Sequence, residues 1–218
     1  MRQSPDSPPV RWIAAADTEA FTRTARDRIL DAATRAIAAR GSFLVVLAGG
    51  NTPRDIYAAL RAADADWPRW HVFFGDERCV AADDPSRNSV MAARALLDHV
   101  PIPPAQVHAV PAGIGADAAA RAYADLLRGV DDFDLVLLGL GEDGHTASLF
   151  PRHDWGTAPD AADALAIVDA PKPPPQRVSL SARRLSRTRQ ALFLVAGKSK
   201  IDAVTRWREG ADIPARAI

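Results

Sequence analysis

Several features that would assign this 218-residue sequence to a particular class of protein are scarce or missing. Cys79 is the single cysteine, which excludes an internal disulfide and a zinc site built from several cysteines. The 27 basic and 27 acidic residues balance to zero net charge, so the one-signed excess of a nucleic-acid or anionic-membrane surface is missing. No apolar run reaches the roughly 20 residues of a membrane helix, and the opening MRQSPDSPPVRW lacks the apolar core of an export signal. We therefore expect a cytoplasmic protein with no nucleic-acid or membrane partner.

Motifs for metal binding and covalent catalysis are missing as well. The five histidines are scattered, and none is paired at helical spacing or with the cysteine, so we expect no metal site. There is no GxSxG motif of a serine hydrolase, and no cysteine-hydrolase signature surrounds Cys79. If the protein is a hydrolase, it is predicted to use activated water rather than a covalent nucleophile.

Short apolar segments alternate with segments of helical periodicity along most of the chain. Strands are predicted at 43–47, 72–74, 107–110, 133–138, 165–168, 178–180 and 191–195, and helices at 18–40, 53–60, 88–97, 116–127 and 198–207. Asp17 or Thr18 is the expected N-cap of the first helix and Gly41 its end, while Thr52 is the expected N-cap of the second. This alternation predicts an α/β protein with a mostly parallel central sheet and helices on both faces. Residues 1–14 are predicted to be a flexible lead-in and residues 15–218 a single domain.

Three polar, glycine-bearing segments follow predicted strands, where ligands of α/β sheets bind. The first, Ala-Gly-Gly-Asn-Thr-Pro at 48–53, combines Gly49 and Gly50 with Asn51 and Thr52 at a helix N-terminus. Free backbone N–H groups there favour anions, although the segment could equally be an unoccupied turn. It fits neither the Walker motif nor the GxGxxG dinucleotide motif.

The second segment contains Asp76, Glu77 and Arg78, with Arg87 and Asn88 further on. Arg78 suits a phosphate or carboxylate because its guanidinium forms paired, charge-assisted hydrogen bonds. Asp76 could orient a catalytic base or hold sugar hydroxyl groups. A solvated loop is the alternative reading of these charges.

The third segment, GLGEDGHTASLFP at 139–151, is the most informative. Gly139, Gly141 and Gly144 allow the backbone to bend close to a ligand, and His145 follows the bend. A histidine titrates near neutral pH and is the usual general base, although an isolated histidine is more often a structural group. Further along, Gly-Lys-Ser-Lys at 197–200 places Lys200 at a predicted helix start, as a phosphate clamp or as a solvated turn.

Together these motifs, with RVSLS at 177–181, resemble those of the 6-phosphogluconolactonase family from about residue 15 to residue 215. After the histidine the sequence reads Thr-Ala-Ser-Leu-Phe-Pro, as in the lactonases, whereas the related glucosamine-6-phosphate deaminases continue toward Ala-Phe-Asn. Asn51 stands where the family usually has serine. The resemblance implies a Rossmann-like fold, no metal or organic cofactor, and hydrolysis of 6-phospho-D-glucono-1,5-lactone in the oxidative pentose phosphate pathway.

By the same resemblance, His145 is the general base and Asp76 its orienting partner. Arg78, Lys200 and Arg177 are implied to bind the phosphate, and backbone N–H groups of the glycine-rich turns are expected to stabilise the oxyanion. The partner is then a small phosphosugar lactone, and the protein a monomer or small homo-oligomer. The alternatives are a deaminase or isomerase acting on glucosamine 6-phosphate, and a sugar-phosphate sensor that binds without turnover.

Overall fold

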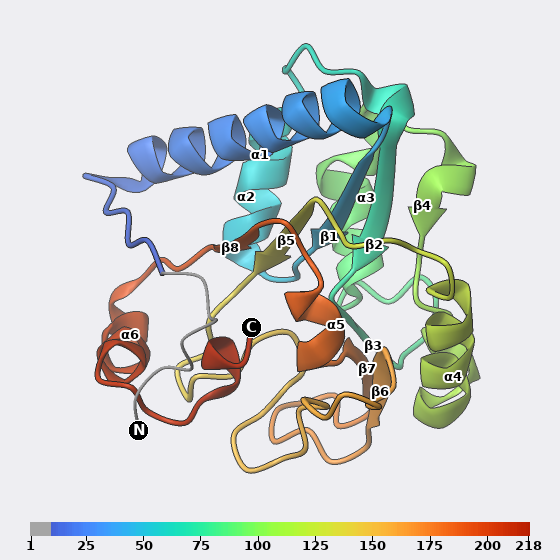
Figure 1. The fold of residues 1–218 in the computed structure, drawn as a ribbon, viewed down its shortest axis with the longest axis vertical. Helices are drawn as coiled ribbons and strands as arrows, with labels where there is room; N and C mark the ends of the chain where they lie inside the picture. Colours follow the sequence, from blue (N-terminus) through green and yellow to red (C-terminus); the bar gives the residue numbers. More distant parts are fainter. Residues whose placement is uncertain (1–9) are drawn as a thin grey trace.

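The computed structural model describes residues 10–218, and its central layer is a five-stranded parallel sheet (Figure 1). The strand order is β4 (Val107–His108), β2 (Trp70–Phe74), β1 (Phe43–Leu47), β5 (Leu135–Leu138) and β8 (Ala191–Phe193). Four of the five residues of β1 and all four of β5 are buried, as expected for apolar strands covered on both faces. The predicted α/β class and parallel central sheet are confirmed.

The first helix, α1 (Thr18–Arg40), contacts α2 (Asn51–Leu60), which in turn contacts α3 (Asn88–Ala95). The Asp17 carboxylate caps α1 by accepting a 2.8 Å hydrogen bond from the Ala20 amide, and Gly41 ends it in the left-handed region. Both ends were predicted. Its buried residues recur at helical spacing and face the sheet layer: Ala25, Ile29, Ala32, Ala33 and Ala36.

The direction in which strands are added reverses beside β1. From β1 the chain passes through α2 to β2 and through α3 to β4, always away from β5. It then returns through α4 (Ala116–Leu126) to β5 on the opposite side of β1. Right-handed crossovers place α2 and α3 on one face of the sheet and α4 on the other. The carboxyl ends of β1 and β5 therefore form a topological switch point, where ligands of such sheets bind.

A second, antiparallel sheet of three strands corrects part of the sequence prediction. Its order is β3 (Asp76–Arg78), β7 (Arg177–Leu180) and β6 (Ala164–Ile167), with α4 packed against β6 and β7. The segments at 165–168 and 178–180 were expected to be strands and are, but they do not belong to the parallel sheet. Residues 76–78, expected to lie in a loop, form the edge strand that joins the two sheets in sequence.

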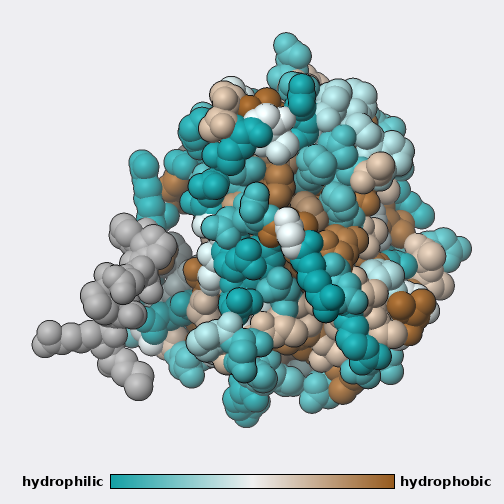
Figure 2. All heavy atoms as spheres, turned by 45° about the vertical axis from the view of Figure 1, so that its right-hand side comes forward, coloured by the Kyte–Doolittle hydropathy of each residue, from teal (hydrophilic) through white to brown (hydrophobic). Residues whose placement is uncertain are grey.

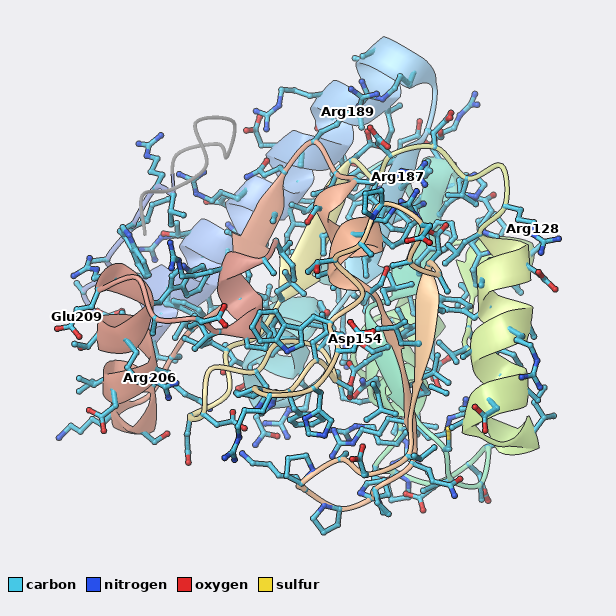
Figure 3. All side chains as sticks on the ribbon, turned by 60° about the horizontal axis from the view of Figure 1, so that its bottom comes forward. Arg128, Asp154, Arg187, Arg189, Arg206 and Glu209 are labelled. Carbon is cyan, nitrogen blue, oxygen red and sulfur yellow. The ribbon has the colours of Figure 1, made fainter. Side chains whose placement is uncertain are left out.

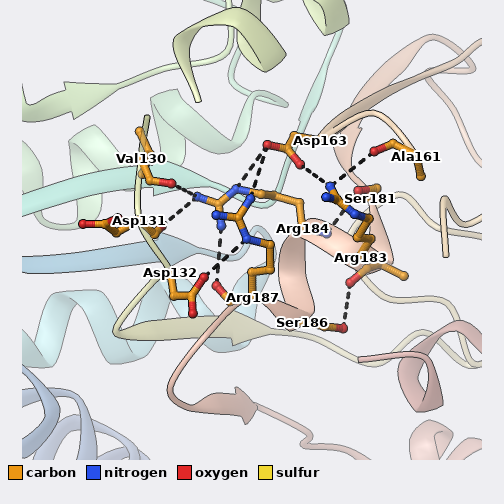
Figure 4. Close-up of polar contacts among 11 residues, drawn as sticks. Val130, Asp131, Asp132, Ala161, Asp163, Ser181, Arg183, Arg184, Ser186 and Arg187 are labelled. Atoms are coloured by element: carbon orange, nitrogen blue, oxygen red, sulfur yellow. Dashed lines mark hydrogen bonds and ion pairs between the residues drawn. The ribbon is translucent and has the colours of Figure 1, made fainter. Parts of the chain in front are cut away.

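An arginine–aspartate cluster ties this second sheet to the approach to β5 (Figure 4). Arg184 of α5 (Ala182–Ser186) is fully buried and donates to the carbonyl oxygens of Val130 and Asp131. Its guanidinium also lies 3.8 Å from the ring centroid of Phe133. Burial lowers the pKa of Arg184 to about 10, so the group stays charged at neutral pH. Asp163 completes the cluster with ion pairs to Arg184 and its neighbours.

The predicted flexible lead-in lies mostly outside the described residues. Residues 10–14 have no regular structure, but Trp12 packs edge-on against Trp207 of α6 (Ile201–Arg208), with 5.3 Å between ring centroids.

Hydrophilic side chains cover most of the face shown in Figure 2. Within residues 10–218, no helix combines the length and apolar character needed to cross a membrane.

Candidate active site

The three polar segments predicted to carry the chemistry meet at one edge of the central sheet. Residues 48–50 leave β1, Gly75 leaves β2 and residues 139–146 leave β5. β1 pairs with both neighbours in parallel, so all three carboxyl ends point the same way. The switch point between β1 and β5 therefore lies between the first and third segments.

His145 is held at this edge by Asp143. The Nδ1 atom of His145 lies 2.5 Å from the Oδ1 atom of Asp143, and the histidine side chain is 19% exposed. The ring also packs against Phe150, with 4.9 Å between centroids. A proton on Nδ1, donated to the carboxylate, leaves the lone pair on Nε2 as the acceptor. The residue that orients His145 directly is therefore Asp143, whereas Asp76 was expected to do so.

The electrostatic environment keeps His145 neutral at neutral pH. Burial lowers the pKa of His145 below its ordinary value of 6.5, and the charge of nearby Lys172 lowers it further, while Asp143 and Asp76 oppose the shift. Burial raises the pKa of Asp143, but the charge and hydrogen bonds of His145 outweigh it, so that pKa lies below 3.8. The pair is therefore a neutral imidazole beside a carboxylate, the arrangement of a general base with its orienting group.

The turn before His145 requires glycine for steric reasons. A Cβ atom on Gly141 would lie 2.0 Å from the Nδ1 atom of His145. Gly144 has φ 91° and approaches Ile213 so closely that a Cβ atom would lie 2.8 Å from its Cγ2 atom. The N–H of Gly141 donates to the His145 carbonyl and that of Gly144 to the Gly141 carbonyl. Because both N–H groups are engaged within the turn, the expectation that they stabilise an oxyanion is wrong for these two residues.

Alternation along β3 separates a site face from a structural face. Asp76 and Arg78 lie on one face, opposite Ser179 and Arg177 of β7, and Glu77 lies on the other. The Glu77 carboxylate is fully buried and accepts hydrogen bonds from the amides of Asn88 and Ser89 at the start of α3. Glu77 therefore caps α3, which it reaches from another element.

Asp76 joins the three segments through a buried hydrogen-bond network. Its carboxylate accepts a 2.6 Å bond from the Ser148 hydroxyl and a 2.9 Å bond from the Asn88 side chain. Asn88 in turn lies so close to Gly49 that a Cβ atom there would be 1.9 Å from its Oδ1 atom. Burial raises the pKa of Asp76, although Ser148, Arg78 and Arg177 counteract it. The predicted residues Gly49, Asp76 and Asn88 are thus brought together, with Asp76 as the link.

Arg78 lies in a cavity of about 470 Å³ that also contains the N-terminus of α2. Gly50 is the N-cap of α2 and Asn51 its first residue, so Thr52 lies inside the helix and is not the expected cap. No side chain caps this helix end, which leaves its first N–H groups available to an anion. Arg78 donates one bond to the Ser86 carbonyl.

Two residues expected to bind phosphate, Lys200 and Arg177, do not line the Arg78 cavity. Lys200 lies in the short 3₁₀ turn Lys198–Lys200 before α6 and is not among the residues that line the Arg78 cavity. Arg177 is buried and donates to the carbonyl oxygens of Lys172, Pro173 and Pro174. These bonds fix the 172–174 loop beside the site, and the Nη1 atom lies 3.4 Å from the Ser148 hydroxyl. Phosphate binding by Arg177 stays a prediction.

A second cavity, of about 640 Å³, is lined in part by Asp143. Asp154 lines it from the loop after Phe150 and Arg206 from α6 (Figure 3). Arg206 also donates to the Asp143 carbonyl oxygen at 3.4 Å. Among residues 10–218, no three histidine, cysteine, aspartate or glutamate side chains gather in a way that would hold a metal ion.

Two residues of this site, Asp143 and Ser148, were not singled out from the sequence. Asp143 was visible only as an acidic residue in the glycine-rich motif, although its spacing of two from His145 suits a local hydrogen bond. Ser148 carried no signal, because its partner Asp76 is 72 residues away in the chain.

Comparison with known proteins shows the family to which this chain belongs. Residues 16–218 match the family model described as glucosamine-6-phosphate isomerases/6-phosphogluconolactonase. The 6-phosphogluconolactonase of Mycobacterium tuberculosis is 40% identical over 210 residues, covering 90% of this chain and 85% of the relative. That of Synechocystis is 42% identical over 180 residues, covering 78% and 73%.

A solved structure agrees as well. The crystal structure of 6-phosphogluconolactonase from Thermotoga maritima superposes with a TM-score of 0.83 at 30% identity, over 91% of this chain and 90% of that one. The resemblance seen in the motifs is confirmed by sequence and by fold. The chain therefore belongs to the glucosamine-6-phosphate isomerase/6-phosphogluconolactonase family.

Proposed function

We propose that this protein hydrolyses 6-phospho-D-glucono-1,5-lactone to 6-phosphogluconate, the second step of the oxidative pentose phosphate pathway. The observation that carries the proposal is the neutral His145, oriented by Asp143 at the switch point between β1 and β5. The relatives that carry the lactonase name support the choice of substrate.

The Nε2 atom of His145 accepts a proton from a water molecule as the water oxygen attacks C1 of the lactone. The bond from C1 to the ring oxygen then breaks, and the imidazolium returns the proton to that oxygen, giving a carboxylic acid and a hydroxyl group. Asp143 keeps the proton on Nδ1 and stabilises the transient positive charge. General-base catalysis of this kind contributes roughly 10²–10⁴-fold, which suits an activated ester.

The phosphate group is bound by Arg78 together with the free N–H groups at the start of α2. Lys200 is the second cation proposed for it; it lies in the turn Lys198–Lys200, outside the lining of the Arg78 cavity, so its side chain has to reach the phosphate from beyond that cavity. Anchoring the phosphate converts binding energy at a remote group into alignment of the carbonyl with the base. Asp76 acts as a positioning residue that holds the loops of the base and of the phosphate site together.

The test is an assay of freshly generated 6-phosphogluconolactone against its spontaneous hydrolysis, with wild type and His145→Ala side by side. We expect acceleration by the wild type, a lower kcat in the variant with KM little changed, and slow turnover of unphosphorylated gluconolactone. Equal rates for the two proteins would refute the role of His145, and equal rates on the two lactones would refute the phosphate site. Release of ammonia from glucosamine 6-phosphate would instead identify a deaminase, and sugar-phosphate binding without turnover would identify a sensor.

A cytoplasmic location and a monomeric or small homo-oligomeric state belong to the same proposal. Neither a nucleic acid nor a membrane is part of it, because the net charge is zero. Size-exclusion chromatography with light scattering measures the assembly state.

A further inference from the structure

The cavity that contains Arg78 continues as a groove between α2 and α3, and arginines line it. Arginine accounts for 24 of the 218 residues, since only three of the 27 basic residues are lysines. Five of the 14 residues that line the cavity are arginines, about three times that share: Arg54, Arg61, Arg78, Arg87 and Arg94. Asp55 is the one carboxylate among the lining residues, and it is paired with Arg54. Arg87 is paired with Glu77 behind the cavity wall. The excess of positive charge in the groove therefore comes from Arg61, Arg78 and Arg94.

Several of these guanidinium groups are fixed by the backbone. Arg61 donates to the carbonyl oxygens of Arg94 and Ala95, both at 2.7 Å. Arg87 donates to the Val110 carbonyl and pairs with Glu77. Arg78 donates to a carbonyl through Nη1, and its buried Nε atom has no hydrogen-bond partner. Glu77 balances the charge of Arg87, whereas Arg61 and Arg78 are held by neutral carbonyl groups. Cations held in this way keep their charge and lose little entropy when an anion binds.

The groove contains more cations than a single phosphate group needs. Arg78 and the start of α2 are assigned to the 6-phosphate of the sugar. Arg54, Arg61 and Arg94 lie further along the same cavity, over an apolar floor formed by Ala58, Met91 and Ala95. Uncompensated positive charge arranged along a groove matches a ligand with negative charges in a row.

We propose that this groove binds a chain of two or more phosphate groups, as in inorganic polyphosphates or the phosphate arm of a nucleotide. The first phosphate occupies the Arg78 end and the others extend toward Arg94. Such a ligand excludes the sugar phosphate because both require Arg78. The inference adds a second ligand class to the site and predicts competitive inhibition.

The test is isothermal titration calorimetry of the full chain with tripolyphosphate and with orthophosphate at about 0.15 M salt, where exposed charges are screened beyond roughly 8 Å. We expect tripolyphosphate to bind roughly tenfold or more tightly than orthophosphate, since each added charged hydrogen bond is worth about that factor. Arg94→Gln should remove most of this advantage and leave orthophosphate binding unchanged. The Arg94 side chain is exposed, so the variant should fold, and a thermal melt checks this.

Arg128→Gln is the matched control, because Arg128 is an exposed arginine just beyond the end of α4, paired with Asp125. Equal affinity of the wild type for the two anions would overturn the proposal. So would full tripolyphosphate binding by Arg94→Gln, or an equal loss in Arg128→Gln, which would indicate a general charge effect. ATP distinguishes the sources: binding tighter than tripolyphosphate shows contact of the nucleoside with the apolar floor, and equal binding shows recognition of the phosphates alone. Binding is read without turnover, so a failure of the lactonase proposal would not be mistaken for a failure of this one.

Discussion

Replacing Gly141 by alanine should disable the base without disturbing the substrate-binding groups. A Cβ atom at this position would lie 2.0 Å from the Nδ1 atom and 2.2 Å from the Cε1 atom of His145. Ordinary contact begins near 3.4 Å, so the ring would have to retreat by about 1.4 Å. The same Cβ atom would lie 2.6 Å from the Oδ1 atom of Asp143. The carboxylate would therefore also have to move, and its hydrogen bond to His145 would be disturbed.

The size of the effect follows from this displacement. A misplacement of about 1 Å at the reacting groups costs on the order of 10²-fold in rate, so kcat should fall by roughly 10²-fold. KM should change little, because Arg78 and the start of α2 lie in another segment. The His145 side chain is partly exposed and can swing outward, which limits the loss of stability to about 1–3 kcal/mol.

Gly139→Ala is the matched control in the same turn. Nothing lies within 4 Å of a Cβ atom built there, so kcat and the thermal midpoint should remain at the wild-type level. The measurement is the rate on the phosphorylated lactone after subtraction of spontaneous hydrolysis, with a thermal melt of each variant. Full activity of Gly141→Ala, or an equal loss in Gly139→Ala, would refute the steric argument.

Other consequences can be measured with the same assay or by denaturation. The kcat, measured after subtraction of spontaneous hydrolysis, should decline only below pH 6.5, because the base must be neutral and burial lowers the pKa of His145. Lys172→Met removes a nearby positive charge, so this decline should move to higher pH. An unchanged pH profile would contradict the placement of that charge. Asp143→Asn should lower kcat by roughly 10²–10⁴-fold at nearly constant KM, since a side-chain amide can hold the wrong tautomer; a change in KM alone would argue against it. Arg78→Gln should raise KM roughly 10- to 100-fold through the loss of an ionic hydrogen bond, and a pure kcat effect would exclude a binding role. Glu77→Ala should destabilise the fold by about 3–5 kcal/mol in chemical denaturation, because the buried Arg87 and the N–H groups at the start of α3 lose their partner; a loss below about 1 kcal/mol would show that water replaces the carboxylate.

The parts of the fold that could be predicted are those set by local sequence. The apolar run at 43–47 and the capped helix at 18–40 have the bounds that periodicity and capping predict, and the run at 133–138 contains β5, which begins at Leu135. The sheet to which a strand belongs is a different matter, because it depends on pairing between distant segments. The strand at 178–180 is short and its sequence suits either sheet; its pairing with Asp76–Arg78 and with Ala164–Ile167 places it in the antiparallel one.

The same distinction between local sequence and contacts of distant segments holds for the residues of the site. His145 could be singled out because its glycine-rich context is contiguous in the sequence. Asp76 was singled out as well, but its partner Ser148 is 72 residues away in the chain, so its function as a link could not be predicted from a local motif. Arg177 was singled out as an anion ligand, but its bonds to three carbonyl groups of the 172–174 loop depend on the loop conformation and were not predicted.

The proposed mechanism gives the two aspartates near His145 different tasks, one orienting the histidine and one linking the loops. Asp143 is two residues from His145 and can fix its tautomer, but a partner so close in sequence cannot fix the turn relative to the phosphate site. Asp76 lies on β3 next to Arg78, and through Ser148 it grips the loop that carries His145. The distance between base and phosphate cation is thereby set through one buried carboxylate. Asp76→Asn should then lower kcat/KM for the phosphorylated lactone more than for the unphosphorylated one, because only the former uses both ends of that link. Equal losses on the two lactones would assign Asp76 to the base alone.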